Sequence, residues 1–90
     1  TDTPLQERFA ESILRTVIEN GEAALADGSD YAARANLLLC GTYALNGTLP
    51  IGVVTDWATH GIEHEVSAIY DIPHGAGLAI LFPNWMKYVY

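Results

Sequence analysis

Four stretches of residues at helical spacing, separated by turn-forming residues, constrain the fold of this chain more than any other feature. The first begins where Thr3 precedes Pro4, and apolar residues then recur on one face as far as about Ala26. A second stretch follows the turn residues 27–29 and can be capped by Asp30. These patterns predict an all-α fold.

Further turn signals divide the second half of the chain. Gly47 ends the second helix, and the link that follows is rich in turn-forming residues, with residues 53–54 as the only hint of a strand. Thr55 or Asp56 can cap a third helix that runs to about Tyr70.

Two prolines set the expected limits of the last helices. Pro73 disfavours the helical conformation at Ile72 and suits the start of a new helix, so the third helix should stop near Asp71. Pro83 lies in the fourth helix and is expected to break or kink it. Residues 1–90 are expected to form a single all-helical unit.

All three histidines of the chain lie in the short run from His60 through His64 to His74. On a helix, His60 and His64 are one turn apart on the same face. A tight αα-hairpin can fold His74 back toward them, and its place at a helix N-terminus keeps its imidazole neutral and able to bind metal. One histidine alone is more often a core or surface residue, but this clustering favours a metal or catalytic site.

Composition restricts the possible partners and compartment. A net charge of −7 argues against sequence-independent binding of nucleic acid or an anionic membrane. The single cysteine, Cys40, lies in an apolar run, which predicts a buried thiol in a reducing cytoplasm. No long apolar span or signal sequence is present, and a first residue other than Met suggests a piece of a longer protein.

Two local patterns offer other interpretations of the histidine run. His60, Glu63 and His64 fit the H-x-x-E-H pattern of the inverted zinc peptidases, in which the glutamate is the general base, but an acidic third ligand far downstream is missing. Asp56 and His60 are also at metal-binding spacing, although Asp56 is more simply a helix cap. Glu63 and Glu65 flank His64 and are candidates for hydrogen-bond acceptors that support a metal-bound histidine. Helical geometry points each of them away from His64, however, which favours solvated charges.

Four aromatic residues near the histidines allow two roles. They could line a substrate channel, but aromatic residues at helical spacing are core residues more often. They are Trp57, Tyr70, Trp85 and Tyr88.

The segments RANLLLCGTYALNG and DWATHGIEHEVSAIYDIPHGAGLAILFPNWMKYV closely resemble the carboxy-terminal helical domain of the iron-containing alcohol dehydrogenases, nearest the butanol dehydrogenase and aldehyde reductase branch. The resemblance covers residues 31–89, whereas residues 1–30 match only as a helix of the right kind. It implies a partial metal-binding domain of a two-domain enzyme, whose amino-terminal dinucleotide-binding domain is not in this chain.

In this family, one aspartate and three histidines hold iron or zinc, Fe2+ or Zn2+ by branch. The resemblance implies that His60 and His74 are two of these metal ligands, and that the other two lie on an upstream helix outside this chain. His64 corresponds to a histidine beside the metal and the nicotinamide, which implies a catalytic role in proton transfer; the alternative is a supporting or core histidine.

The implied activity is NAD(P)H-linked interconversion of primary alcohols and aldehydes by hydride transfer, in a homodimer of the longer protein. The 90 residues alone should bind metal weakly and be inactive, because hydride transfer needs both substrates in contact. A helical metal-binding or assembly module without catalysis is the alternative, followed by the peptidase.

Overall fold

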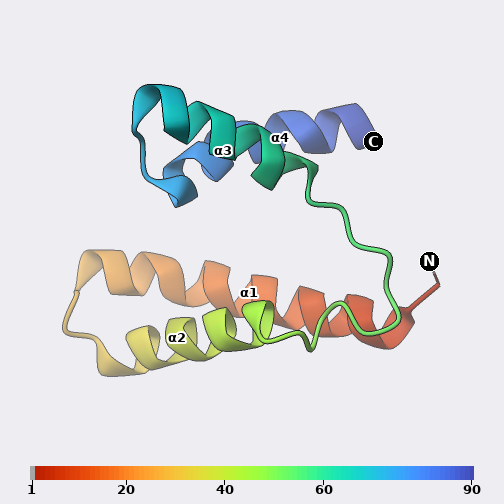
Figure 1. Cartoon of the computed structure of the whole chain (residues 1–90). Coiled ribbons are helices and arrows are strands. Elements are labelled where there is room, and N and C mark those ends of the chain that lie inside the picture. The colour runs from red at the N-terminus through yellow and green to blue at the C-terminus, as the bar shows by residue number, and fades with distance from the viewer. Residues whose placement is uncertain (1) are drawn as a thin grey trace. The chain divides into compact units, whose positions relative to one another are not determined.

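The computed structural model describes residues 2–90, which contain four helices and no strand. They form two compact units, one that ends at residue 55 and one of residues 56–90, each built on a pair of helices (Figure 1). The all-α prediction is confirmed, and residues 53–54, the one hint of a strand, do not form one. None of the helices is long and apolar enough to cross a membrane.

In the first unit, α1 (Pro4–Ala26) and α2 (Tyr31–Leu45) form a hairpin. Asp27 closes the turn because its carboxylate accepts hydrogen bonds from the backbone N–H and the hydroxyl of Ser29, at 3.0 and 2.6 Å. The Asp30 side chain then accepts from the Ala33 backbone N–H at 3.0 Å. The predicted cap at Asp30 is confirmed.

A narrow interface joins α1 to α2. Ala33 and Cys40 are buried, and their spacing of seven residues places them on one face of α2. Asn36 on α2 donates a hydrogen bond to the side chain of Asn20 on α1 at 3.4 Å. The predicted burial of the Cys40 thiol is confirmed, whereas apolar side chains elsewhere on α2, among them Leu38, remain exposed.

After α2, the chain returns along the start of α1. The side-chain amide of Gln6 donates to the carbonyl oxygens of Thr48 and Leu49, at 2.6 and 2.9 Å. Gly47 and Gly52 adopt positive φ angles of 88° and 70°, which glycine reaches without the steric cost of a Cβ.

In the second unit, α3 (Ala58–Tyr70) and α4 (His74–Val89) are joined by three residues. Asp71 ends α3 in the left-handed conformation, with φ 53° and ψ 46°, and Pro73 precedes the first residue of α4. The predicted stop near Asp71 and restart after Pro73 are both confirmed.

Of the break or kink predicted at Pro83, the break is wrong, because α4 continues through Pro83, while the kink stays a prediction. Proline removes only one N–H donor, and the carbonyl that would have accepted it belongs to the exposed Ala79, where water can replace it. Asn84, the next residue, adds a side-chain hydrogen bond of 3.2 Å to the carbonyl oxygen of Ile80.

Candidate metal centre

The turn between α3 and α4 brings the three histidines together. His60 and His64 lie one turn apart on α3, and His74 is the first residue of α4. The ring centroid of His74 lies 5.1 Å from that of His60 and 5.3 Å from that of His64, while His60 and His64 are 6.4 Å apart. The expected convergence is confirmed; which of the rings bind metal stays a prediction.

These separations suit a shared metal ion. Two imidazoles that bind one tetrahedral ion through nitrogens at about 2.0–2.1 Å place their ring centroids about 5 Å apart. His74 stands at this separation from both His60 and His64, whereas the His60–His64 pair is wider. Imidazole nitrogens are donors that both iron and zinc accept. The donor types present therefore fit the metal that the resemblance implies, and the donor atoms of Glu63, His64 and His74 lie within 4.8 Å of one another, a group that does not include His60.

Glu63 lies beneath these rings, and it is the only fully buried charged side chain of residues 2–90. One carboxylate oxygen is hydrogen-bonded to Nδ1 of His74, and the other accepts from the hydroxyl of Ser67. The prediction that Glu63 is a solvated charge is wrong, while Glu65 is exposed as expected. Helical geometry does point Glu63 away from His64, but that face is the one that α4 covers.

The hydrogen bonds of Glu63 favour its ionised form. The bond from Ser67 lowers the pKa of Glu63 below its ordinary value, burial opposes this by raising the pKa, and the bond to His74 lowers it again. An ionised carboxylate only accepts hydrogen bonds, so the proton in the Glu63–His74 bond belongs to Nδ1. The Nε2 atom of His74 is then left with a free lone pair.

Gly77 makes room for this carboxylate. A Cβ added at Gly77 would lie 2.6 Å from Cγ of Glu63 and 2.8 Å from its Cδ, closer than real Cβ contacts come. Gly77 is itself buried and stands one turn after His74 on α4. The only sequence signals for this arrangement are the helical spacing of Glu63 and Ser67 and of His74 and Gly77, which do not show that the two pairs meet.

The residues around α3 resolve two open alternatives. The Asp56 carboxylate accepts a hydrogen bond of 2.8 Å from the backbone N–H of Ala58, the first residue of α3, so one of its oxygens is engaged by the backbone and not by His60. Helix α3 begins at Ala58 and its N-cap is Trp57, which makes no side-chain cap hydrogen bond, so the predicted cap at Thr55 or Asp56 is wrong. Trp57 is 60% exposed and meets the ring of His60 edge-on, with centroids 4.8 Å apart. Within this structure it belongs to the histidine site and not to a core.

The peptidase interpretation gains nothing from this geometry. In that chemistry the glutamate of H-x-x-E-H must reach a water molecule as a general base. Glu63 is fully buried, and both of its carboxylate oxygens are engaged by Ser67 and His74. A group so enclosed is suited to holding a neighbouring side chain.

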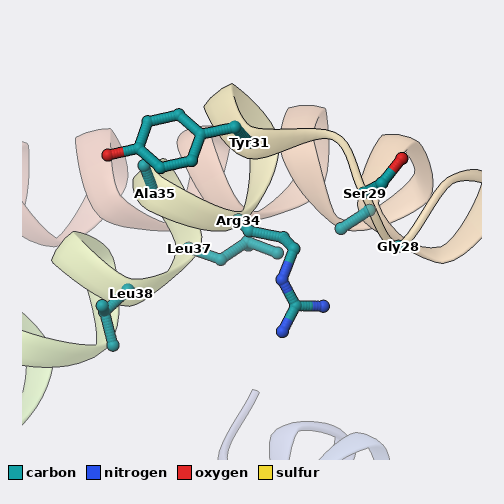
Figure 2. Close-up of a pocket in the computed structure, with 8 residues that line it drawn as sticks. Gly28, Ser29, Tyr31, Arg34, Ala35, Leu37 and Leu38 are labelled. Atoms are coloured by element: carbon teal, nitrogen blue, oxygen red, sulfur yellow. The ribbon is translucent and has the colours of Figure 1, made fainter.

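A surface hollow in the first unit is a weaker candidate for a site. It lies where α1 turns into α2, and Figure 2 shows the Arg34 guanidinium extending away from the helix. None of the residues around it offers a histidine, cysteine or carboxylate. They are Ala24, Gly28, Ser29, Tyr31, Arg34, Ala35, Leu37 and Leu38. The chemistry of the described residues is concentrated at the histidines.

Comparison with known families identifies the chain. The model of the Fe-containing alcohol dehydrogenase family, C-terminal, matches residues 1–90. The chain belongs to this family. The match includes residues 1–30 and so extends beyond residues 31–89, to which the sequence resemblance was limited.

Individual relatives of this family member cover nearly the whole chain. The probable NADH-dependent butanol dehydrogenase 1 of Bacillus subtilis is 57% identical over 98% of the chain and 23% of its own length. NADH-dependent butanol dehydrogenase B of Clostridium acetobutylicum is 55% identical over 94% of the chain and 22% of its own length. NADPH-dependent aldehyde reductase YqhD of Escherichia coli is 46% identical over 91% of the chain and 21% of its own length.

The family member described here spans about a fifth of the length of these relatives. No solved structure matches the chain significantly.

Proposed function

We propose that the natural polypeptide containing these residues is a metal-dependent, NAD(P)H-linked dehydrogenase that interconverts primary alcohols and aldehydes. The observation that carries this proposal is the convergence of three imidazoles at the α3–α4 turn of a chain in the Fe-containing alcohol dehydrogenase family. Relatives named as NADH-dependent butanol dehydrogenases and an NADPH-dependent aldehyde reductase support the choice of substrate class.

Within this activity, His60 and His74 are proposed as two of the metal ligands. Their ring separation of 5.1 Å supports a shared ion, and the bond from Nδ1 of His74 to Glu63 leaves Nε2 for the metal. A divalent metal held there, iron or zinc, would supply a Lewis acid for the carbonyl oxygen, and a bound nicotinamide would supply or accept the hydride.

His64 is proposed as the residue that gives or takes the proton at the substrate oxygen. It is exposed, and its ring lies beside His74 at 5.3 Å between centroids. An imidazole that is not bound to metal can take up a proton at one ring nitrogen and give it back, which suits it to general acid–base catalysis. This role requires that His64 stays off the metal.

The remaining expectations extend the same proposal. Residues 1–90 would belong to one helical domain, and the dinucleotide would bind to another domain of the longer polypeptide. That polypeptide would act in the cytoplasm as a homodimer. Exposed apolar side chains on α1 and α2, among them Leu14, Ile18 and Leu38, are consistent with cover by further polypeptide.

The test is oxidation of NADH and NADPH with butanal by the natural polypeptide, before and after a chelator removes its metal. The proposal expects turnover that chelation abolishes and that added iron or zinc restores. Absence of turnover with either cofactor, in a protein with full metal occupancy, would overturn it.

A further inference from the structure

Glu63 is a buried carboxylate that needs a reason to be buried, because charged groups are expensive to remove from water unless they are paired. It is 0% exposed, and its two oxygens are matched to two partners, Ser67 on its own helix and His74 on α4. In the second unit it therefore acts as the polar link between the two helices that carry the histidines.

His74 is hydrogen-bonded to the charged Glu63 side chain and still leaves part of its ring accessible. The His74 side chain is 47% exposed, whereas the side chain of Glu63, its hydrogen-bond partner, is fully buried. Nδ1 is engaged by the buried Glu63 carboxylate, so Nε2 is the ring nitrogen that this bond leaves available. A histidine that donates one ring N–H to a carboxylate has a fixed tautomer and a more basic second nitrogen, which strengthens metal binding.

From this geometry we infer that Glu63 is a positioning residue of the metal site: it holds the proton of His74 on Nδ1 and so presents Nε2 to the metal. The inference rests on the proposed function, since it assigns a role at the metal site proposed above. Gly77 contributes to this arrangement, because a side chain at position 77 would occupy the space of the Glu63 carboxylate.

Ser67 makes a conservative variant possible. Its hydroxyl donates to Glu63 and also lies 3.0 Å from the carbonyl oxygen of Ile72, although it has only one proton to donate. In Glu63→Gln, the amide oxygen can accept from His74, the amide NH2 can donate to Ser67, and the Ser67 proton can turn to Ile72. Glu63→Leu fills a similar space but removes the acceptor.

The experiment measures two quantities on the natural full-length polypeptide. Nitrogen-15 NMR of labelled histidine in the metal-free protein reports the His74 tautomer, assigned by comparison with His74→Ala. Competition with a chromogenic chelator gives the Kd for zinc. The variants are Glu63→Gln and Glu63→Leu, with the exposed Glu65→Gln as the matched control.

We expect Nδ1 of His74 to be protonated in the wild type and in Glu63→Gln, and this preference to be lost in Glu63→Leu. Zinc binding should weaken about 10- to 100-fold in Glu63→Leu. Glu63→Gln should remain closer to the wild type, and Glu65→Gln should match it.

Three results would overturn the inference. They are a wild-type His74 with its proton on Nε2, an unchanged zinc Kd in Glu63→Leu, and a loss in Glu63→Gln as large as in His74→Ala, which would make Glu63 a metal ligand. The wild-type tautomer decides the question even if Glu63→Leu fails to fold. A wild-type protein that binds neither iron nor zinc would instead overturn the proposed function.

Discussion

The buried carboxylate of Glu63 is hydrogen-bonded to Nδ1 of His74, eleven residues further along the chain and on the next helix. This contact connects the packing of α3 against α4 with the chemistry of the histidines, because Glu63 is buried between the two helices and also holds the His74 ring. Substitutions at the α3–α4 interface should therefore also change the affinity for metal.

Replacing either proposed ligand should remove metal. We expect His60→Ala and His74→Ala each to lower metal occupancy and to abolish aldehyde reduction, because a site deprived of one imidazole loses a strong donor. Metal content by elemental analysis and NADPH oxidation measure the two effects. Full occupancy in both variants would place the metal elsewhere.

His64→Ala should separate metal binding from catalysis. We expect metal content close to that of the wild type and a fall in kcat of about 10²- to 10⁴-fold, the usual contribution of a general acid or base. Loss of metal from this variant would show that His64 is a ligand, contrary to the proposed role.

Gly77→Ala should disturb both packing and metal binding. The added methyl group would meet the Glu63 side chain, and overpacking of this kind costs about 1–3 kcal/mol in the free energy of unfolding. Gly75→Ala on the same helix is the control, since nothing in the structure lies within 4 Å of its Cβ. Urea denaturation of the metal-free protein distinguishes the two variants, and equal midpoints would contradict the predicted collision.

Asp30→Ala should weaken the start of α2. Its side chain caps the helix through the Ala33 N–H, and loss of such a cap costs about 0.5–2 kcal/mol. Thr3 occupies the same position before α1 but makes no side-chain cap hydrogen bond, so Thr3→Ala should cost less. Hydrogen exchange of the α1 and α2 backbone amides measures both, and a larger effect for Thr3→Ala would be the contrary result.

The turn between α1 and α2 should stabilise the fold in a pH-dependent way. Hydrogen bonds from the side chain and the backbone of Ser29 lower the pKa of Asp27 in the folded state. A lowered folded pKa contributes stability above the unfolded pKa, about 3.9 for aspartate, and that stability is lost as the pH falls through the folded value.

Ser29→Ala should therefore be less stable than the wild type near pH 6, and this difference should shrink near pH 3. The midpoint of urea denaturation at the two pH values measures it. Ser12→Ala, an exposed serine within α1, provides the control, and its effect should be the same at both pH values. A Ser29→Ala difference that does not change with pH would argue against the Asp27 contribution.

Local sequence was sufficient for most helix boundaries. Pro4, Asp30 and Pro73 act through their own backbone or an adjacent N–H, so their effects were predictable without knowledge of packing. Pro83 was the exception, because whether a proline breaks a helix depends on what replaces the lost hydrogen bond. The exposure of Ala79 supplied that answer, and exposure is a property of the folded chain.

The sequence by itself determined that three histidines at helical spacing would meet at a turn, because i, i+4 spacing and a proline-set hairpin are local properties. Only the tertiary structure decided what lies beneath them. Glutamate is usually a surface residue, but Glu63 is buried because α4 covers its face of α3. Gly77 leaves space for its side chain, and Ser67 and His74 are hydrogen-bonded to its two carboxylate oxygens. Burial and pairing depend on contacts between helices, which helical spacing alone does not encode.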